Sequence, residues 1–213
     1  MNDQKHILLS YLAAILRIGI RDIIIAFVII MMDVMLLLPA WFPPAEAIYF
    51  YLMAPPIIAC NLWGLWLFFD KPGERQLKHV LFLGICGFII SVGSVILIQK
   101  FAYVYLNIST PLFFIGSIAV YMIMAFFVGR LSIGQFYRRL KQTEETESGS
   151  FLMAGILSGI GYVAANIFLS ITGENMVYQV LIALYSLFAV VFVYFMMYLY
   201  YYWYVRKMCG TSL

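Results

Sequence analysis

Long, continuous apolar runs follow one another along most of the chain. Each run is about 20 residues long, which is the length of α-helix that crosses a hydrocarbon core of roughly 30 Å. The runs do not alternate between apolar and polar positions, as the strands of a membrane barrel would. They predict an all-α membrane bundle of about six transmembrane helices, at residues 22–40, 48–70, 80–99, 111–129, 151–172 and 176–204.

An amphipathic pattern precedes the first run. Over residues 1–21, apolar positions recur at helical spacing, and a polar stripe on the same segment carries Arg17 and Arg21. A basic stripe on an apolar helix is typical of a helix lying in the membrane surface, which we expect here. The alternative is a long first span whose two arginines reach back to the interface. Residues 22–213 are then one transmembrane domain, with cytoplasmic loops at about 70–79 and 130–150.

The amino-acid composition of the whole chain also indicates a membrane protein. Hydrophobic residues make up 65% of the chain and charged residues 11%, against about 25% charged in soluble domains. The net charge of +3 is too small to predict direct binding of nucleic acid. Cys60, Cys86 and Cys209 form no CxxC pair, so we expect no disulfide framework, no metal site and no cofactor.

The basic residues predict the orientation in the membrane, because Lys and Arg concentrate in short cytoplasmic loops. With the N-terminus inside, twelve of the thirteen basic residues fall on the cytoplasmic side, and Lys100 alone falls outside. This partition favours six spans with both termini in the cytoplasm, in a bacterial inner (plasma) membrane. The aromatic run at residues 198–204, just before Arg206, fits an interfacial belt on the inner side.

Asp33 is the one acidic residue deep within a predicted span. An ionisable group there costs at least about 2.5–3.5 kcal/mol and suggests a functional site. Asp33 lies about eight residues from the outer end of its span, roughly 12 Å deep, and Pro55 and Pro56 reach a similar depth on the next span. The two prolines leave the carbonyls of Tyr51 and Leu52 without helical partners.

Those carbonyls need a partner in lipid, and two interpretations remain open. A proton or cation site could form from Asp33, the carbonyls and Asn61, further along the same span. Alternatively, the prolines form a kink that heals by local hydrogen bonding, with Asp33 neutral and structural.

Small residues mark expected contacts between helices, because they let backbones approach closely. Gly155 and Gly159 form a GxxxG pair on the predicted fifth span, where Asn166 is expected to hydrogen-bond between helices. Gly84, Gly87 and Ser91 give the third span a similar face. These faces and the small size of the protein predict a homo-oligomer in the bilayer.

The charged inner face favours a non-enzymatic membrane subunit. We expect an anchor or sensor that docks a soluble cytoplasmic partner, as in signalling or defence systems. The residues expected to contact the partner are basic and lie in the two inner loops: Lys71, Arg75, Lys78, Arg138, Arg139 and Lys141.

Two other function classes remain open. A small transporter, substrate-binding membrane component or ion channel would use Asp33 and the helix break at Pro55 and Pro56. An intramembrane enzyme would need catalytic groups, and the one candidate pair is His79 with Cys86. Seven positions on a continuous helix would hold these two residues about 10 Å apart along the axis, too far for direct proton transfer.

Overall fold

The computed structural model describes residues 26–42, 47–69, 76–141 and 174–209. These ranges are almost entirely helical, with a short non-helical connection at residues 106–110, and contain no strand, which confirms the predicted all-α class. The elements in chain order are η1 (Ala26–Leu37), α3 (Leu38–Trp41), α4 (Ala47–Phe68), α5 (Gln76–Lys100), η2 (Phe101–Tyr105), α6 (Pro111–Lys141) and α8 (Glu174–Cys209).

Four segments of the described chain are long and apolar enough to cross a membrane: Ala47–Phe68, Leu77–Tyr105, Pro111–Gly134 and Met176–Lys207. They match four of the six predicted spans. A shorter apolar helix, Ile30–Trp41, covers the outer part of the predicted first span. The predicted surface helix at 1–21 and the predicted fifth span at 151–172, with Gly155, Gly159 and Asn166, lie outside the described residues.

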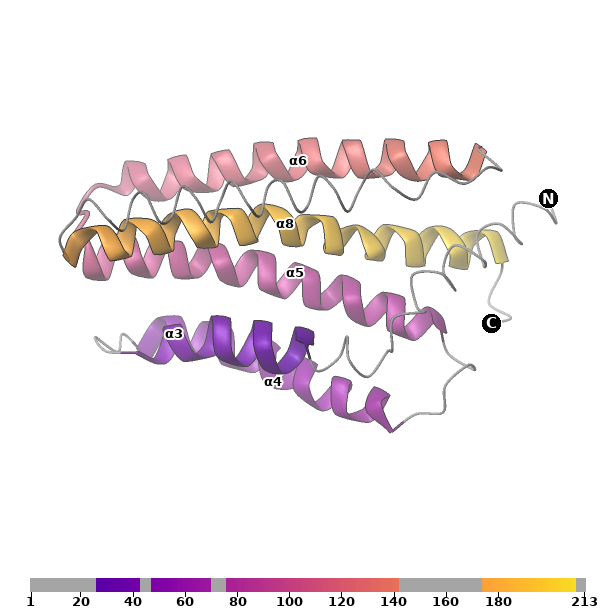
Figure 1. Ribbon diagram of the computed structural model, residues 1–213, viewed down its shortest axis with the longest axis horizontal. Coiled ribbons are helices and arrows are strands. Elements are labelled where there is room, and N and C mark those ends of the chain that lie inside the picture. Colours follow the sequence, from indigo (N-terminus) through magenta and orange to yellow (C-terminus); the bar gives the residue numbers. More distant parts are fainter. Residues whose placement is uncertain (1–25, 43–46, 70–75, 142–173, 210–213) are drawn as a thin grey trace.

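The α5–α8 pair forms the centre of the bundle (Figure 1). Gly84 and Gly87 allow this close approach. A Cβ atom on Gly84 would lie 2.8 Å from the backbone nitrogen of Leu199, and one on Gly87 would lie 2.6 Å from the Cβ of Phe195. The predicted small-residue face of this span is therefore the surface on which α8 packs.

Figure 1 shows α6 along one side of this pair and the hairpin of η1, α3 and α4 along the other. The Ser91 hydroxyl joins three helices, because it donates to the Ala189 carbonyl at 2.6 Å and lies 2.9 Å from the Tyr121 hydroxyl. A polar side chain shared in this way ties α5, α6 and α8 together where apolar packing alone is weakly directional in lipid.

The helix directions follow from contacts at their two ends. Leu199, late in α8, lies beside Gly84, early in α5, and Tyr185 lies beside Phe101, just past the end of α5. Therefore α5 and α8 are antiparallel. Ser91 contacts Tyr121 in the first half of α6 and Ala189 in the first half of α8. Further along the same two helices, Gly129 of α6 lies against Met197 of α8. Therefore α6 and α8 are parallel.

The first described segment differs from the expected α-helix. Residues Ala26–Leu37 form a π-helix of 12 residues, followed by one α-helical turn. Such helices are rare, and short ones are frequent at functional sites. Asp33 lies within this segment. No glycine or proline between residues 26 and 37 marks the change in the sequence.

The predicted helix break on α4 is wrong. The helix runs without interruption from Ala47 to Phe68 with Pro55 and Pro56 inside it. A membrane helix tolerates internal prolines when neighbouring groups or local adjustments satisfy the freed carbonyls. The next residue, Ile57, is fully buried in the main apolar cluster with Met53 and Cys60, so packing against η1 and α5 supports the helix at the prolines.

Candidate intramembrane polar site

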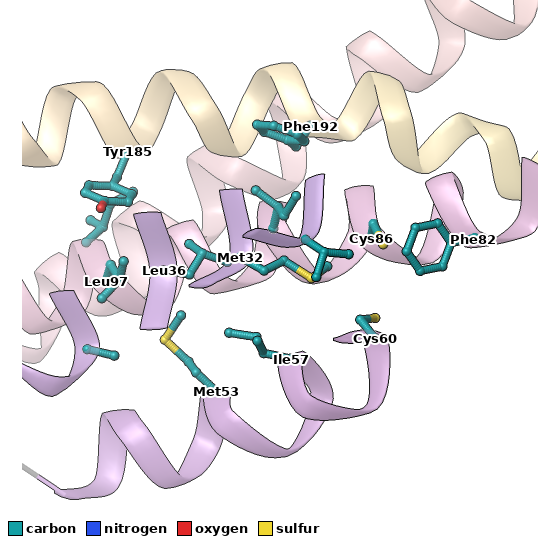
Figure 2. Close-up of a cluster of buried hydrophobic side chains, with 14 of the residues drawn as sticks. Met32, Leu36, Met53, Ile57, Cys60, Phe82, Cys86, Leu97, Tyr185 and Phe192 are labelled. Carbon is teal, nitrogen blue, oxygen red and sulfur yellow. The ribbon is translucent and has the colours of Figure 1, made fainter. Parts of the chain in front are cut away.

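Asp33 and Asn61 form a polar pair between η1 and α4. The amide Nδ2 of Asn61 donates to Oδ1 of Asp33 at 3.0 Å and to Oδ2 at 3.2 Å. Both side chains are half-buried. Their immediate neighbours in the chain, Met32 and Cys60, belong to the buried apolar cluster drawn in Figure 2. The carboxylate is therefore held by a specific donor at the edge of an apolar core.

The amide of Asn61 also carries an oxygen that is not used. Its Oδ1 is buried and has no hydrogen-bond partner among the described residues. An amide presents two donors on one side and an acceptor on the other. As placed, the donors suit an ionised Asp33. A half-turn of the same amide would offer Oδ1 to a protonated Asp33, so the pair can form a hydrogen bond in either protonation state.

The structure brings together only part of the predicted site. Among the described residues, Asp33 accepts hydrogen bonds from Asn61, and the carbonyls of Tyr51 and Leu52 are not part of this pair. Leu52 precedes Asn61 by nine residues, which is about two and a half turns of α-helix and so places it on the opposite face. The side chain of Leu52 is accordingly 58% exposed, and that of Tyr51 is also exposed, at 71%. Counting residues along each span leaves open the rotation of α4 about its axis, which decides which of its groups faces Asp33.

A second polar centre lies at the end of α5 that meets α3. Lys100 is completely buried, and its Nζ donates to the carbonyls of Pro39, Ala40 and Phe42 at 2.9, 2.9 and 2.8 Å. Three carbonyls match the three N–H donors of an ammonium group. They are among the last carbonyls of the α3 turn, where a helix lacks internal partners and carries partial negative charge.

Lys100 therefore caps the helix that carries Asp33. The sequence interpretation placed Lys100 outside the membrane as the single exception to the basic-residue partition, and gave it no role. That exception was the available signal, because the single basic residue of the predicted outer loops needs a partner. Its partners are backbone carbonyls, which residue type alone does not reveal.

The predicted docking residues are described only in part. Lys78 lies with its Nζ 4.8 Å from the ring centre of Trp66 on α4, a cation–π contact. Lys71 and Arg75 lie outside the described residues, as do the side chains of Arg138, Arg139 and Lys141 at the end of α6. At the same end, Lys207 on α8 lies 5.1 Å from the ring centre of Trp203.

The candidate catalytic pair is not assembled. His79 and Cys86 lie seven positions apart on one continuous helix, α5, and Cys86 is completely buried in the apolar cluster that also holds Cys60 of α4. Within the described ranges, no group of three or more His, Cys, Asp and Glu side chains is placed to hold a metal ion.

Comparisons of this chain with protein-family models, with curated proteins and with solved structures found no match. The features of the molecule that bear on its function are therefore the two polar centres and the distribution of charge.

Proposed function

We propose that the protein is a six-span membrane protein with both termini in the cytoplasm, as in a bacterial inner (plasma) membrane. The parallel directions of α6 and α8 support this topology, because the chain leaves α6 at one end of the bundle and enters α8 at the other. The span predicted from the sequence at residues 151–172, outside the described residues, would account for that return. The basic side chains Lys78, Arg206 and Lys207 lie at the end assigned to the cytoplasm, as the positive-inside rule requires.

Within this topology we infer a small transporter or ion channel that works through the Asp33–Asn61 pair. The observation that carries this inference is the intramembrane carboxylate with an amide that can pair with its charged and its neutral form. Ionisable residues within spans commonly mark ion and proton pathways. A substrate-binding membrane component would use the same pair.

The expected chemistry is uptake and release of a proton or small cation by Asp33. Ionised Asp33 is stabilised by the two bonds from Nδ2 of Asn61. When a proton neutralises the carboxyl group, the amide turns and accepts it through Oδ1. The pair thus keeps a hydrogen bond while the charge inside the membrane changes, which lowers the cost of holding either form in lipid.

The test is ion flux in proteoliposomes that hold the purified protein and a pH-sensitive dye. We expect an imposed gradient to dissipate with the native chain and to persist at the protein-free rate with Asp33→Asn. Glu174→Gln is the matched control, because Glu174 is the other acidic residue in the described ranges and lies at the start of α8. Native flux equal to that of empty vesicles, or full flux in Asp33→Asn, would contradict the proposal.

A second candidate is the subunit that docks a cytoplasmic partner, as a homo-oligomer or as part of a larger assembly. It is favoured by the basic residues at one end of the bundle: Lys78 on α5 and Arg206 and Lys207 on α8. Co-purification after mild solubilisation tests it. A soluble protein that is retained by the native chain and lost in Lys78→Glu would support docking, whereas purification of the native chain alone would count against it.

A further inference from the structure

The pair of Asp33 and Asn61 offers few oxygen atoms to a ligand. Two belong to the carboxylate of Asp33, and the third is Oδ1 of Asn61, which faces the carboxyl group only after the amide turns. The residues on either side of the pair in the sequence have side chains without oxygen: Met32, Val34, Cys60 and Leu62. The side chains at this place therefore supply at most three oxygens.

The backbone of α4 adds no ligand to the pair. The helix runs without interruption from Ala47 to Phe68, so its carbonyls near Asn61 remain in helical hydrogen bonds. The carbonyls freed by the two prolines belong to Tyr51 and Leu52, which lie at least about 13 Å from Asn61 along the helix axis. Divalent cations take about six to eight oxygen ligands in proteins, and K⁺ needs carbonyl oxygens that replace its hydration shell. The described residues cannot complete such a shell around Asp33.

A proton needs much less from the site. One O–H bond forms on the carboxylate of Asp33, and the hydronium ion that supplies the proton leaves as water. The neutral acid is then a donor, and Oδ1 of Asn61 is a buried acceptor that has no partner among the described residues. A proton thus removes the charge and gives the acceptor a partner, whereas a metal ion would leave two charges in apolar surroundings.

We propose that the Asp33–Asn61 pair binds a proton in preference to a metal cation, and that the amide of Asn61 determines this selectivity by accepting the acid proton through Oδ1. The inference rests on the proposed function for its statement that the bound species is transported. Binding itself is measured without flux.

The other titratable groups that the neighbouring helices bury around η1 do not share this site. They are Cys60 of α4, His79, Cys86 and Lys100 of α5, and Tyr185 of α8. Among these, Lys100 and Tyr185 donate to backbone carbonyls of α3 and η1. Within the described part of the chain, the hydrogen bonds to Asp33 come from Asn61, so Asn61 is the residue to change.

The test records infrared difference spectra of the purified protein in nanodiscs, between neutral and acidic pH, with choline as the cation of the buffer. The carbonyl band of protonated Asp33 is the part of the spectrum that Asp33→Asn removes. Asn61→Leu keeps the size and branching of the side chain but has no hydrogen-bonding atoms, so it should shift this band to higher wavenumber. A band at the native position in Asn61→Leu would overturn the role of the amide.

Gln99→Leu is the matched control for Asn61→Leu. Gln99 is also a buried amide whose oxygen has no partner among the described residues, but its Nε2 donates to Ser117 of α6 at 2.7 Å. Its replacement should leave the Asp33 band unchanged. An equal shift of the band in both variants would show a general effect of losing a buried amide and would also overturn the role of Asn61.

The native chain provides a second measurement, which needs no change at Asn61. Replacing choline by sodium or potassium at constant pH should leave the Asp33 band unchanged. Loss of the band would mean that the metal ion displaces the proton, and the assignment to a proton would then be wrong.

The proton assignment and the transport proposal fail separately. If proteoliposomes take up radioactive sodium or rubidium in a manner that requires Asp33, transport stands and proton selectivity is refuted. If the spectra are as expected but no flux depends on Asp33, the proton site stands and the transport proposal is refuted.

Discussion

Replacing Lys100 tests how much a buried ammonium contributes to this bundle. Lys100→Met keeps an unbranched side chain of similar length and removes all three N–H donors. The carbonyls of Pro39, Ala40 and Phe42 then lose bonds of 2.8–2.9 Å. At about 1 kcal/mol for each lost bond, we expect a loss of about 3 kcal/mol in the free energy of unfolding.

Two opposing effects bound this magnitude. The Ala40 carbonyl is buried by its surroundings, and an acceptor left unpaired in such a place costs about 1–3 kcal/mol by itself. Removal of the lysine also removes the cost of burying a charge, which offsets part of the loss. The net effect of Lys100→Met on the free energy of unfolding remains destabilising, because the three carbonyls belong to the end of a helix and have no other helical partners.

The assay is reversible unfolding in mixed micelles, followed by circular dichroism as the denaturing detergent is titrated. Lys207→Met is the matched control, because Lys207 is an exposed lysine whose described contact is with the ring of Trp203. Surface substitutions of this kind usually change stability by less than about 0.5 kcal/mol. Equal stabilities of the Lys100→Met and Lys207→Met proteins would refute the capping role of Lys100.

Two further predictions concern contacts between helices and use the same unfolding assay. Gly87→Ala should destabilise the protein by about 1–3 kcal/mol, because the added Cβ would lie 2.6 Å from a side-chain carbon of α8. Gly134→Ala is the control and should be nearly neutral, because no described atom lies within 4 Å of the position of its Cβ. Similar losses of stability for both variants would refute the packing argument. Tyr185→Phe should cost about 1 kcal/mol by removing the hydroxyl that donates to the Met35 carbonyl. Tyr194→Phe, on the exposed side of α8, is its control, and an equal effect of the two changes would exclude a contribution from that bond.

The helices could be predicted from the sequence where one physical requirement dominates. A hydrocarbon core demands about 20 apolar residues in a helix, and the predicted spans at 48–70 and 111–129 begin within one residue of α4 and α6. The α5 face with Gly84 and Gly87 could be predicted for a similar reason, since close helix approach requires small side chains. Neither prediction depends on knowing which residues of the other helices lie opposite.

The polar contacts depend on partners and could be predicted only in part. Asp33 was identified because a carboxyl group in lipid is costly. Asn61 was included in the same predicted site, but a direct pairing of its amide with Asp33 was not predicted, because counting residues leaves the rotation of α4 undetermined. Lys100 was assigned a side of the membrane from its charge, yet its acceptors are backbone carbonyls that every residue possesses. Cys60 of α4 and Cys86 of α5 are buried in one apolar cluster, although no local pattern in the sequence reports how these two helices are aligned.

Three of the polar contacts share a target, which is the segment from η1 to the end of α3. Asn61 of α4 holds Asp33, Tyr185 of α8 donates to the Met35 carbonyl, and Lys100 of α5 holds the last carbonyls. Apolar packing gives little preference between positions of a helix in lipid, because lipid tails are as apolar as the side chains. Hydrogen bonds from three different helices therefore fix the depth and rotation of this segment. Asp33 therefore lies on an element that hydrogen bonds from three other helices hold in place, which is the support that the proposed proton or ion site requires.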